Sequence, residues 1–335
     1  MKAILLSAAA AAALTVAVAT PALAKEPHIE IEHAVARVVV IVEDRADIGV
    51  EIQQGSSGLP ALRVQRRGDA VRIDGGLGRR VAGIRLGDSI RDCRAGPDRT
   101  RPGQGASVEV RNVGRVNLDD APLIVIRSPR TVSVDAGGAV FGSIGRGGRS
   151  VELGNAGCGD WVIANTEGPV DVSVAGSGAV IVGTSRSLEA SLVGSGEMTA
   201  AATTSIDLSI GGSGSAVIAE ANGDTDISIG GSGEVAIRRG RIPNLSISIG
   251  GSGDVDFGGT AVDVSVSIAG SGDVRVNGGR VETLDVSIAG SGNVSFDGRA
   301  GDVSASIMGS GDVAISGTAR CSVNKMGSGD VRCGG

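Results

Sequence analysis

Aliphatic and polar residues alternate along most of the chain, and glycine turns interrupt the alternation at regular intervals. Residues 267–276 read SIAGSGDVRV, and similar stretches follow at 287–296 (SIAGSGNVSF) and 306–315 (SIMGSGDVAI). Alternation with a period of two on both sides of a turn is typical of two half-buried β-strands. We therefore expect an all-β protein built from a repeated two-strand unit.

The triplet G-S-G marks each copy of this unit and recurs every 18 to 20 residues. Counted from its central serine, aliphatic residues occupy positions −7, −5, −3, +3 and +5 in most copies. One copy cannot bury its apolar face alone, so the copies must stack. The central serines are Ser177, Ser195, Ser213, Ser232, Ser252, Ser271, Ser291, Ser310 and Ser328, with Cys158 in an earlier variant copy.

Two architectures could use this alternation, a meander of antiparallel hairpins or a coil that rises by one strand spacing per turn. Each position carries the same class of residue in copy after copy, which favours parallel columns about 4.8 Å apart. We predict a β-solenoid of about 10–11 coils over residues 117–335. Between the buried positions lie outward serines such as Ser265 and Ser267, which would form regular polar faces.

Four cysteines predict two disulfides rather than a zinc site, because no pair has C-x-x-C spacing. Cys321 and Cys333 fall at positions −7 and +5 of the last copy, so they should face one another and close the end of the stack. The remaining pair would be Cys93 and Cys158, and it would pin residues 75–116 onto the first coils.

The segments before the repeats differ from one another. Residues 1–24 have a basic start, an apolar stretch and an A-x-A site, which predicts an export signal cleaved after Ala24. Residues 25–74 read as strands that cap the stack, since its first layer must be protected against edge pairing. Residues 75–116 are rich in Gly, Pro and Arg and read as a long surface loop. No later stretch is apolar enough to cross a membrane.

Charge and composition change this picture in two ways. Aromatic residues make up only 1% of the chain, so the interior must be filled by Val, Ile, Leu and Ala. Residues 61–115 carry thirteen arginines and six acids, whereas residues 150–335 carry ten basic and twenty-one acidic residues. The arginines are interpreted as a solvated surface or as a basic patch for anionic surfaces.

The sequence offers little catalytic chemistry. The two histidines, His28 and His33, lie near the start of the mature chain, which argues against a Ser-His-Asp site in the repeats. Acids recur at position +2 of the copies, where they either cap the turn or bridge calcium. The calcium candidates are Asp254, Asp273, Asp312 and Asp330.

The recurring SIAGSGDV phrase behind an export signal and the lead-in LRVQRRGDAVRIDG resembles the GIN domain family, the head domain of auto-transporter adhesins. The resemblance extends over roughly residues 34–333. It implies a right-handed parallel β-helix exported by bacteria, and it implies no catalytic residues.

We therefore expect an exported, non-enzymatic β-solenoid without cofactors, located in the periplasm or at the cell surface. It would act as an adhesin-like or scaffold protein that binds an envelope or cell-surface protein or glycan. Self-association stays open, and nucleic acid is not an expected partner. The alternatives are a polysaccharide lyase or hydrolase and an ice-binding protein that uses its serine faces.

Overall fold

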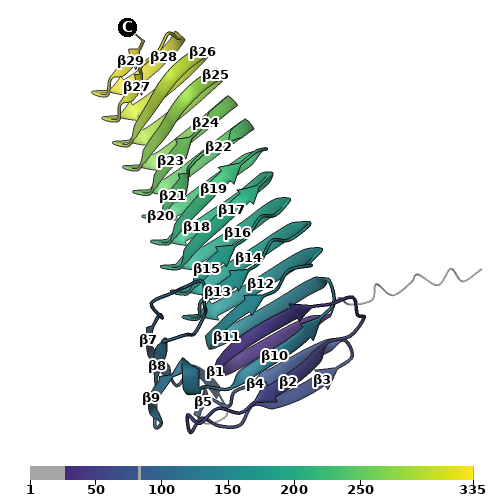
Figure 1. Ribbon diagram of the computed structural model, residues 1–335. Helices are drawn as coiled ribbons and strands as arrows, with labels where there is room; N and C mark the ends of the chain where they lie inside the picture. The colour runs from purple at the N-terminus through teal and green to yellow at the C-terminus, as the bar shows by residue number, and fades with distance from the viewer. Residues whose placement is uncertain (1–26, 82–83, 335) are drawn as a thin grey trace, which may run out of the picture.

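The computed structural model describes residues 27–81 and 84–334 and contains a β-solenoid of about 11 turns (Figure 1). Successive coils rise along one axis from the N-terminal end to the C-terminal end. Among the described residues the one helix is a 3₁₀ turn, η1 (Leu118–Asp120). The predicted all-β solenoid of stacked parallel coils is confirmed.

Each coil contributes one strand to a broad parallel sheet. This sheet begins with parts of β1 (His28–Val42) and β11 (Thr131–Ile144), and each later strand pairs in parallel with the strand one coil earlier. Its other strands are β12 (Ser150–Gly157), β14 (Pro169–Gly176), β16 (Ser187–Gly194), β18 (Ser205–Gly212), β20 (Thr225–Gly231), β22 (Arg241–Gly251), β24 (Thr260–Gly270), part of β25 (Asp273–Gly290), part of β26 (Asn293–Gly309) and β28 (Arg320–Gly327).

A second parallel sheet faces the first across the core. The bent strands β1, β11, β25 and β26 take part in both sheets. The remaining strands of the second sheet are β10 (Leu123–Ser128), β13 (Trp161–Ile163), β15 (Ala179–Val182), β17 (Glu197–Thr203), β19 (Ser215–Ala221), β21 (Glu234–Ile237), β23 (Asp254–Gly258), β27 (Val313–Ile315) and β29 (Val331–Cys333).

Aliphatic columns fill the space between the sheets. Val264, Leu284 and Val303 are register partners in consecutive coils, and each is at most 2% exposed. Val274 and Ile288 are buried as well. The five inward positions of the repeat therefore form one continuous core, as their spacing predicts.

The glycine before each turn serine allows the coils to approach closely. Gly231 has φ +138°, and a Cβ atom there would lie 2.3 Å from the carbonyl oxygen of Gly212 in the preceding coil. The following residue, Ser232, donates its backbone N–H to that same oxygen at 2.8 Å. A side chain at position 231 would therefore disturb both the turn and the stacking.

Short strands cover the N-terminal end of the stack. β2 (Gly49–Gln53) pairs antiparallel with β10, and β4 (Ala70–Asp74) pairs parallel with the start of β1. β3 (Arg63–Arg67) then pairs antiparallel with β4 and forms the outer rim (Figure 1). β1 itself runs parallel to β10 and β11, so it belongs to the first coil rather than to the cap.

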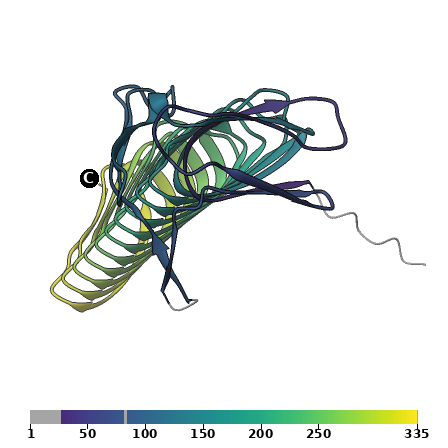
Figure 2. The ribbon, with the colours of Figure 1, turned by 90° about the horizontal axis from the view of Figure 1, so that it is seen from below.

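Residues 75–116 form short strands where the sequence suggested a surface loop. Two strands, β5 (Gly78–Val81) and β6 (Ile84–Asp88), pair antiparallel, and β7 (Ile90–Arg94), β8 (Ser107–Val110) and β9 (Gly114–Asn117) make a three-stranded antiparallel sheet beside the coils (Figure 2). Val108, Val110 and Val116 are buried against Ala139 and Phe141 of β11. The frequent arginines and glycines hide this short alternation in the sequence.

The predicted signal of residues 1–24, with cleavage after Ala24, lies outside the described residues. Within the described part of the chain, no helix has the length and apolar character needed to cross a bilayer.

Candidate functional site

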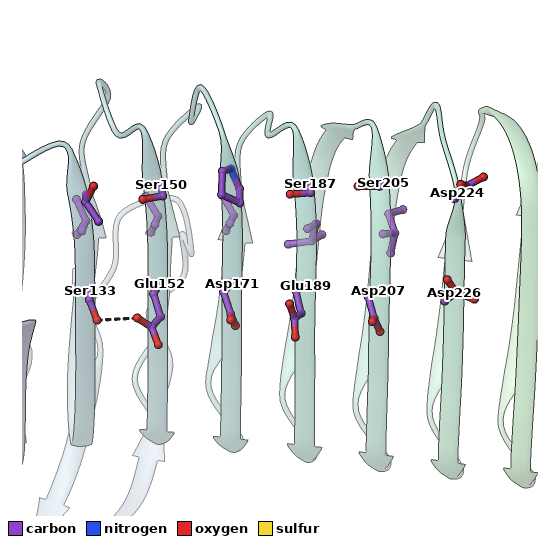
Figure 3. A pocket seen from close by; sticks show the side chains of 17 residues that line it. Ser133, Ser150, Glu152, Asp171, Ser187, Glu189, Ser205, Asp207, Asp224 and Asp226 are labelled. Atoms are coloured by element: carbon purple, nitrogen blue, oxygen red, sulfur yellow. Dashed lines mark hydrogen bonds between the residues drawn. The ribbon is translucent and has the colours of Figure 1, made fainter. Parts of the chain in front are cut away.

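Five consecutive acids form a row on the outer surface of the broad sheet, which we call the acidic row. It consists of register partners from β12 to β20, and neighbouring members are one coil apart, about 4.8 Å. Their carboxylates point to the same side, beside a hollow of 620 Å³ that Ser150, Ser187 and Ser205 also line (Figure 3). The members are Glu152, Asp171, Glu189, Asp207 and Asp226.

No member of the acidic row has an ion-pair partner among the described residues, and four members, Asp171, Glu189, Asp207 and Asp226, also have no side-chain hydrogen bond there. Burial and the neighbouring charges of Glu189 and Glu152 raise the pKa of Asp171. By contrast, Asp302 in another column is neutralised by Arg320, which donates two hydrogen bonds to it, at 2.7 and 2.9 Å.

His28 stands at the N-terminal end of the same column. Its Nε2 lies 3.3 Å from a carboxylate oxygen of Asp135, and its Nδ1 lies 2.9 Å from Ser133 Oγ, which donates to Glu152 at 2.9 Å. Asp135, His28 and Ser133 have the composition of a catalytic triad. Ser133, however, is only 5% exposed, and its hydroxyl donates to Glu152. The arrangement therefore anchors β1 to the acidic row rather than presenting a nucleophile. The sequence did not reveal it, because His28 and Ser133 are 105 residues apart.

A ladder of eight serines runs beside the acidic row, and we call it the serine ladder. Its members are register partners on the outer surface from β14 to β26. The two columns turn the broad sheet into a flat face with hydroxyls at every coil and charge at its N-terminal half. The ladder comprises Ser173, Ser191, Ser209, Ser228, Ser248, Ser267, Ser287 and Ser306.

The acids at position +2 of the repeat bind the next coil through the backbone. Asp254 accepts from the N–H of Asp273 at 2.9 Å, and Asp312 accepts from the N–H of Asp330 at 2.8 Å. Asn293 interrupts the charges between Asp273 and Asp312, because its amide donates to Asp273 at 2.9 Å and its oxygen accepts from the N–H of Asp312 at 3.1 Å. In this structure Asp254, Asp273 and Asp312 thus act as turn caps, whereas Asp330 in the last coil lies 3.6 Å from Lys325 Nζ.

The described residues contain no group of three or more His, Cys, Asp or Glu side chains arranged to hold a metal ion. Calcium binding by the +2 column therefore stays a prediction from the sequence alone.

Cys321 and Cys333 are disulfide-bonded in the last coil, with Cα atoms 6.4 Å apart. Lys325 occupies the inward column above Ile307, where its Nζ donates to the carbonyl of Gly329 at 3.0 Å and lies 3.6 Å from Asp330. A charge thus replaces an aliphatic residue at the exposed end of the core.

Cys93 and Cys158 are also bonded, with Cα atoms 6.2 Å apart. This bond joins β7 to the turn after β12, and Arg99 adds an ion pair with Glu197 at 2.9 Å. Between β7 and the turns at Ser177 and Ser195 lies a groove of 690 Å³. The segment from β7 to β9, which we call the insert, is thus fixed along the first turns of the solenoid.

A second titratable cluster lies on β1 beside a hollow of 490 Å³. The hydrogen bond that Glu30 donates to Glu32, together with burial, raises the pKa of Glu30. Burial opposes ionisation of Glu32, but hydrogen bonds with Glu30 and Arg72 lower its pKa overall. One carboxyl group of the pair therefore holds its proton more tightly than the other.

Comparison with known proteins gives one match. Residues 225–335 match the family described as "Putative auto-transporter adhesin, head GIN domain". They cover the C-terminal coils from β20 onward and overlap the C-terminal part of the wider region of sequence resemblance. No curated protein and no solved structure matches the chain.

Proposed function

Starting from the match of residues 225–335 to a family of adhesin head domains, we propose that the protein is an exported, non-enzymatic binding protein of the cell envelope. Its family description and its β-solenoid are consistent with an adhesin-like role. The binding surface we propose is the flat face that carries the acidic row and the serine ladder.

One observation carries this proposal, namely that four stacked carboxylates lack partners among the described residues, whereas the stacked acids Asp254, Asp302 and Asp312 each accept hydrogen bonds from the next coil. Two such charges repel one another by about 0.9 kcal/mol at one coil spacing in water. A partner with basic groups would relieve this repulsion, and the neighbouring hydroxyls could hydrogen-bond to it at every coil. We therefore propose an envelope or cell-surface protein or glycan that carries amino groups.

The test compares the wild type with a variant in which the row is neutralised, D171N/E189Q/D207N/D226N. The matched control, D69N/E167Q/E234Q/E282Q, removes the same charge from exposed acids elsewhere. Binding to bacterial envelope fractions and to an array of amino-sugar glycans is measured by biolayer interferometry. We expect the row variant to lose at least about tenfold in affinity and the control to keep it. No binding by the wild type, or equal binding by all three, would reject the proposal.

A polysaccharide-cleaving enzyme is the second candidate, and the Glu30–Glu32 pair favours it. A carboxyl group that keeps its proton beside one that is ionised can supply an acid and a base at one hollow. Turnover of an acidic polysaccharide that disappears in Glu30→Gln and persists in Glu167→Gln would establish this activity.

Export through residues 1–24 is part of the proposal. Expression of the full chain in a bacterium with a Sec pathway should yield a mature protein that begins at Lys25. N-terminal sequencing of the periplasmic fraction tests this, and an intact Met1 in that fraction would contradict it.

A further inference from the structure

The rim strand β3 has a free edge. Among the described residues it pairs only with β4, and all five of its residues are exposed. Val64 is 42% exposed although it lies opposite the buried Ile73. Free strand edges offer backbone donors and acceptors to an added strand.

The hairpin register shows which backbone groups are free. Arg67 pairs with Ala70 across the two-residue turn Gly68-Asp69, where Gly68 has φ +60°. In such a hairpin the residues next to the turn exchange hydrogen bonds, and every second pair does so after them. The N–H and C=O groups of Val64 and Arg66 therefore point away from β4, toward the open side.

The edge is also strongly basic. No carboxylate lies within 4.0 Å of the guanidinium groups of Arg63, Arg66 or Arg67 among the described residues, and Arg66 donates to the carbonyl of Ile48 at 2.8 Å. Asp74 lies opposite Arg63 in the register without forming an ion pair.

The opposite end of the solenoid provides a contrast. The edge strand β28 carries two cations, Arg320 and Lys325, and each is paired with an acid of the solenoid, Asp302 or Asp330. Cations at a free edge can serve simply to prevent edge pairing. The arginines of β3 form no ion pair with any described residue, so they are available to an acidic partner.

We propose that β3 is a docking edge for an extended acidic peptide segment of a partner protein, which adds to the cap as one more strand. Val64 and Arg66 supply the backbone hydrogen bonds, and the three arginines pair with carboxylates of the added strand. This mode gives affinity through the backbone and selectivity through charge.

A peptide fits this edge better than an acidic polysaccharide or a lipid surface does. All three would be attracted by the arginines, but a peptide alone matches the alternating donors and acceptors of a strand edge at strand spacing. The inference concerns a surface separate from the acidic row, so the two proposals can fail independently.

The experiment uses the mature full-length protein and a short fluorescent peptide of alternating Glu and Val with blocked ends. Fluorescence anisotropy measures its binding to the wild type, to R63Q/R66Q/R67Q, and to the control R280Q/R299Q/R332Q, whose arginines lie on the solenoid. We expect about a tenfold weaker affinity for the β3 variant and an unchanged affinity for the control. Hydrogen exchange should slow at residues 63–67 when the peptide binds.

Two further probes separate strand addition from simple charge attraction. A peptide of equal charge with a central proline should bind at least about tenfold more weakly, because proline breaks the added ladder. Dextran sulfate and phosphatidylglycerol vesicles should not slow exchange at residues 63–67. Equal binding of the proline peptide, protection by either anionic probe, or no binding of the alternating peptide would overturn the proposal. Circular dichroism verifies that each variant is folded.

Discussion

Two adjacent glycines at the turn before Ser232 have different structural roles. A Cβ at Gly231 would collide with the Gly212 carbonyl at 2.3 Å in a φ region that other residues avoid, whereas a Cβ at Gly230 would meet nothing closer than 3.9 Å. We predict that Gly231→Ala lowers the free energy of unfolding by about 2–4 kcal/mol. Gly230→Ala should change it by less than about 0.5 kcal/mol. Urea denaturation measures both, and equal effects would refute this account of the turn.

Asp171 is expected to make stability depend on pH. Burial and the charges of Glu189 and Glu152 raise its pKa above the ordinary 3.8, so the folded protein holds this proton more tightly than the unfolded chain. At pH 7 Asp171 is ionised, and its charge lowers the free energy of unfolding. This cost disappears as the pH falls from the raised pKa of the folded state to the ordinary pKa of the unfolded chain.

Asp171→Asn should therefore stabilise the protein at pH 7, by about 0.5–1 kcal/mol after solvent screening, and the gain should vanish near pH 3. Glu167→Gln, at an exposed position outside the row, serves as the control. Thermal unfolding at both pH values measures the difference. A gain that persists at pH 3 would show that charge is not its cause.

At the scale of single elements, the last coil ends the stack through Lys325. This residue takes the inward position that Ile268, Ile288 and Ile307 occupy in the three preceding coils. A charge there discourages a second molecule from adding to the open end. Lys325→Ile should therefore self-associate more strongly than the wild type in sedimentation velocity, and Lys325→Gln should not. Identical sedimentation of all three would show that the end is protected by other means.

The two disulfides hold different elements in place. Removing Cys321–Cys333, which closes a short loop, should cost about 3 kcal/mol and speed hydrogen exchange in β28 and β29. Removing Cys93–Cys158 should instead speed exchange in β7, because that bond fixes the insert. In each experiment both cysteines of one pair are replaced by alanine, and the variant of the other pair serves as the control. Faster exchange at both places in either variant would contradict the local roles assigned here.

The repeating elements could be predicted from the sequence because the same five positions are apolar in each copy, as around Ser271. The strands of the insert could not be predicted, because its valines alternate over only a few residues among arginines and glycines. The acidic row was also missed. Its members sit six residues before each turn, and their unpaired state depends on neighbours one coil away.

For the whole molecule, parallel stacking converts a sequence position into a surface column. The acidic row, the serine ladder and the +2 caps all exist because each coil repeats the register of the one before it. The two ends of the stack are closed in different ways. One is closed by antiparallel strands with an arginine-rich rim, and the other by a disulfide and by Lys325 at an inward position of the last coil.

Parallel, in-register stacking is the claim on which the columns depend, and one distance tests it most directly. Ser173 and Ser306 are seven register steps apart in the serine ladder. With cysteine spin labels at both positions, pulsed electron resonance should give a distance centred near 34 Å, which is about 4.8 Å per step. An antiparallel meander would place a second strand between successive copies and give about 67 Å. A distance near that larger value would contradict the account.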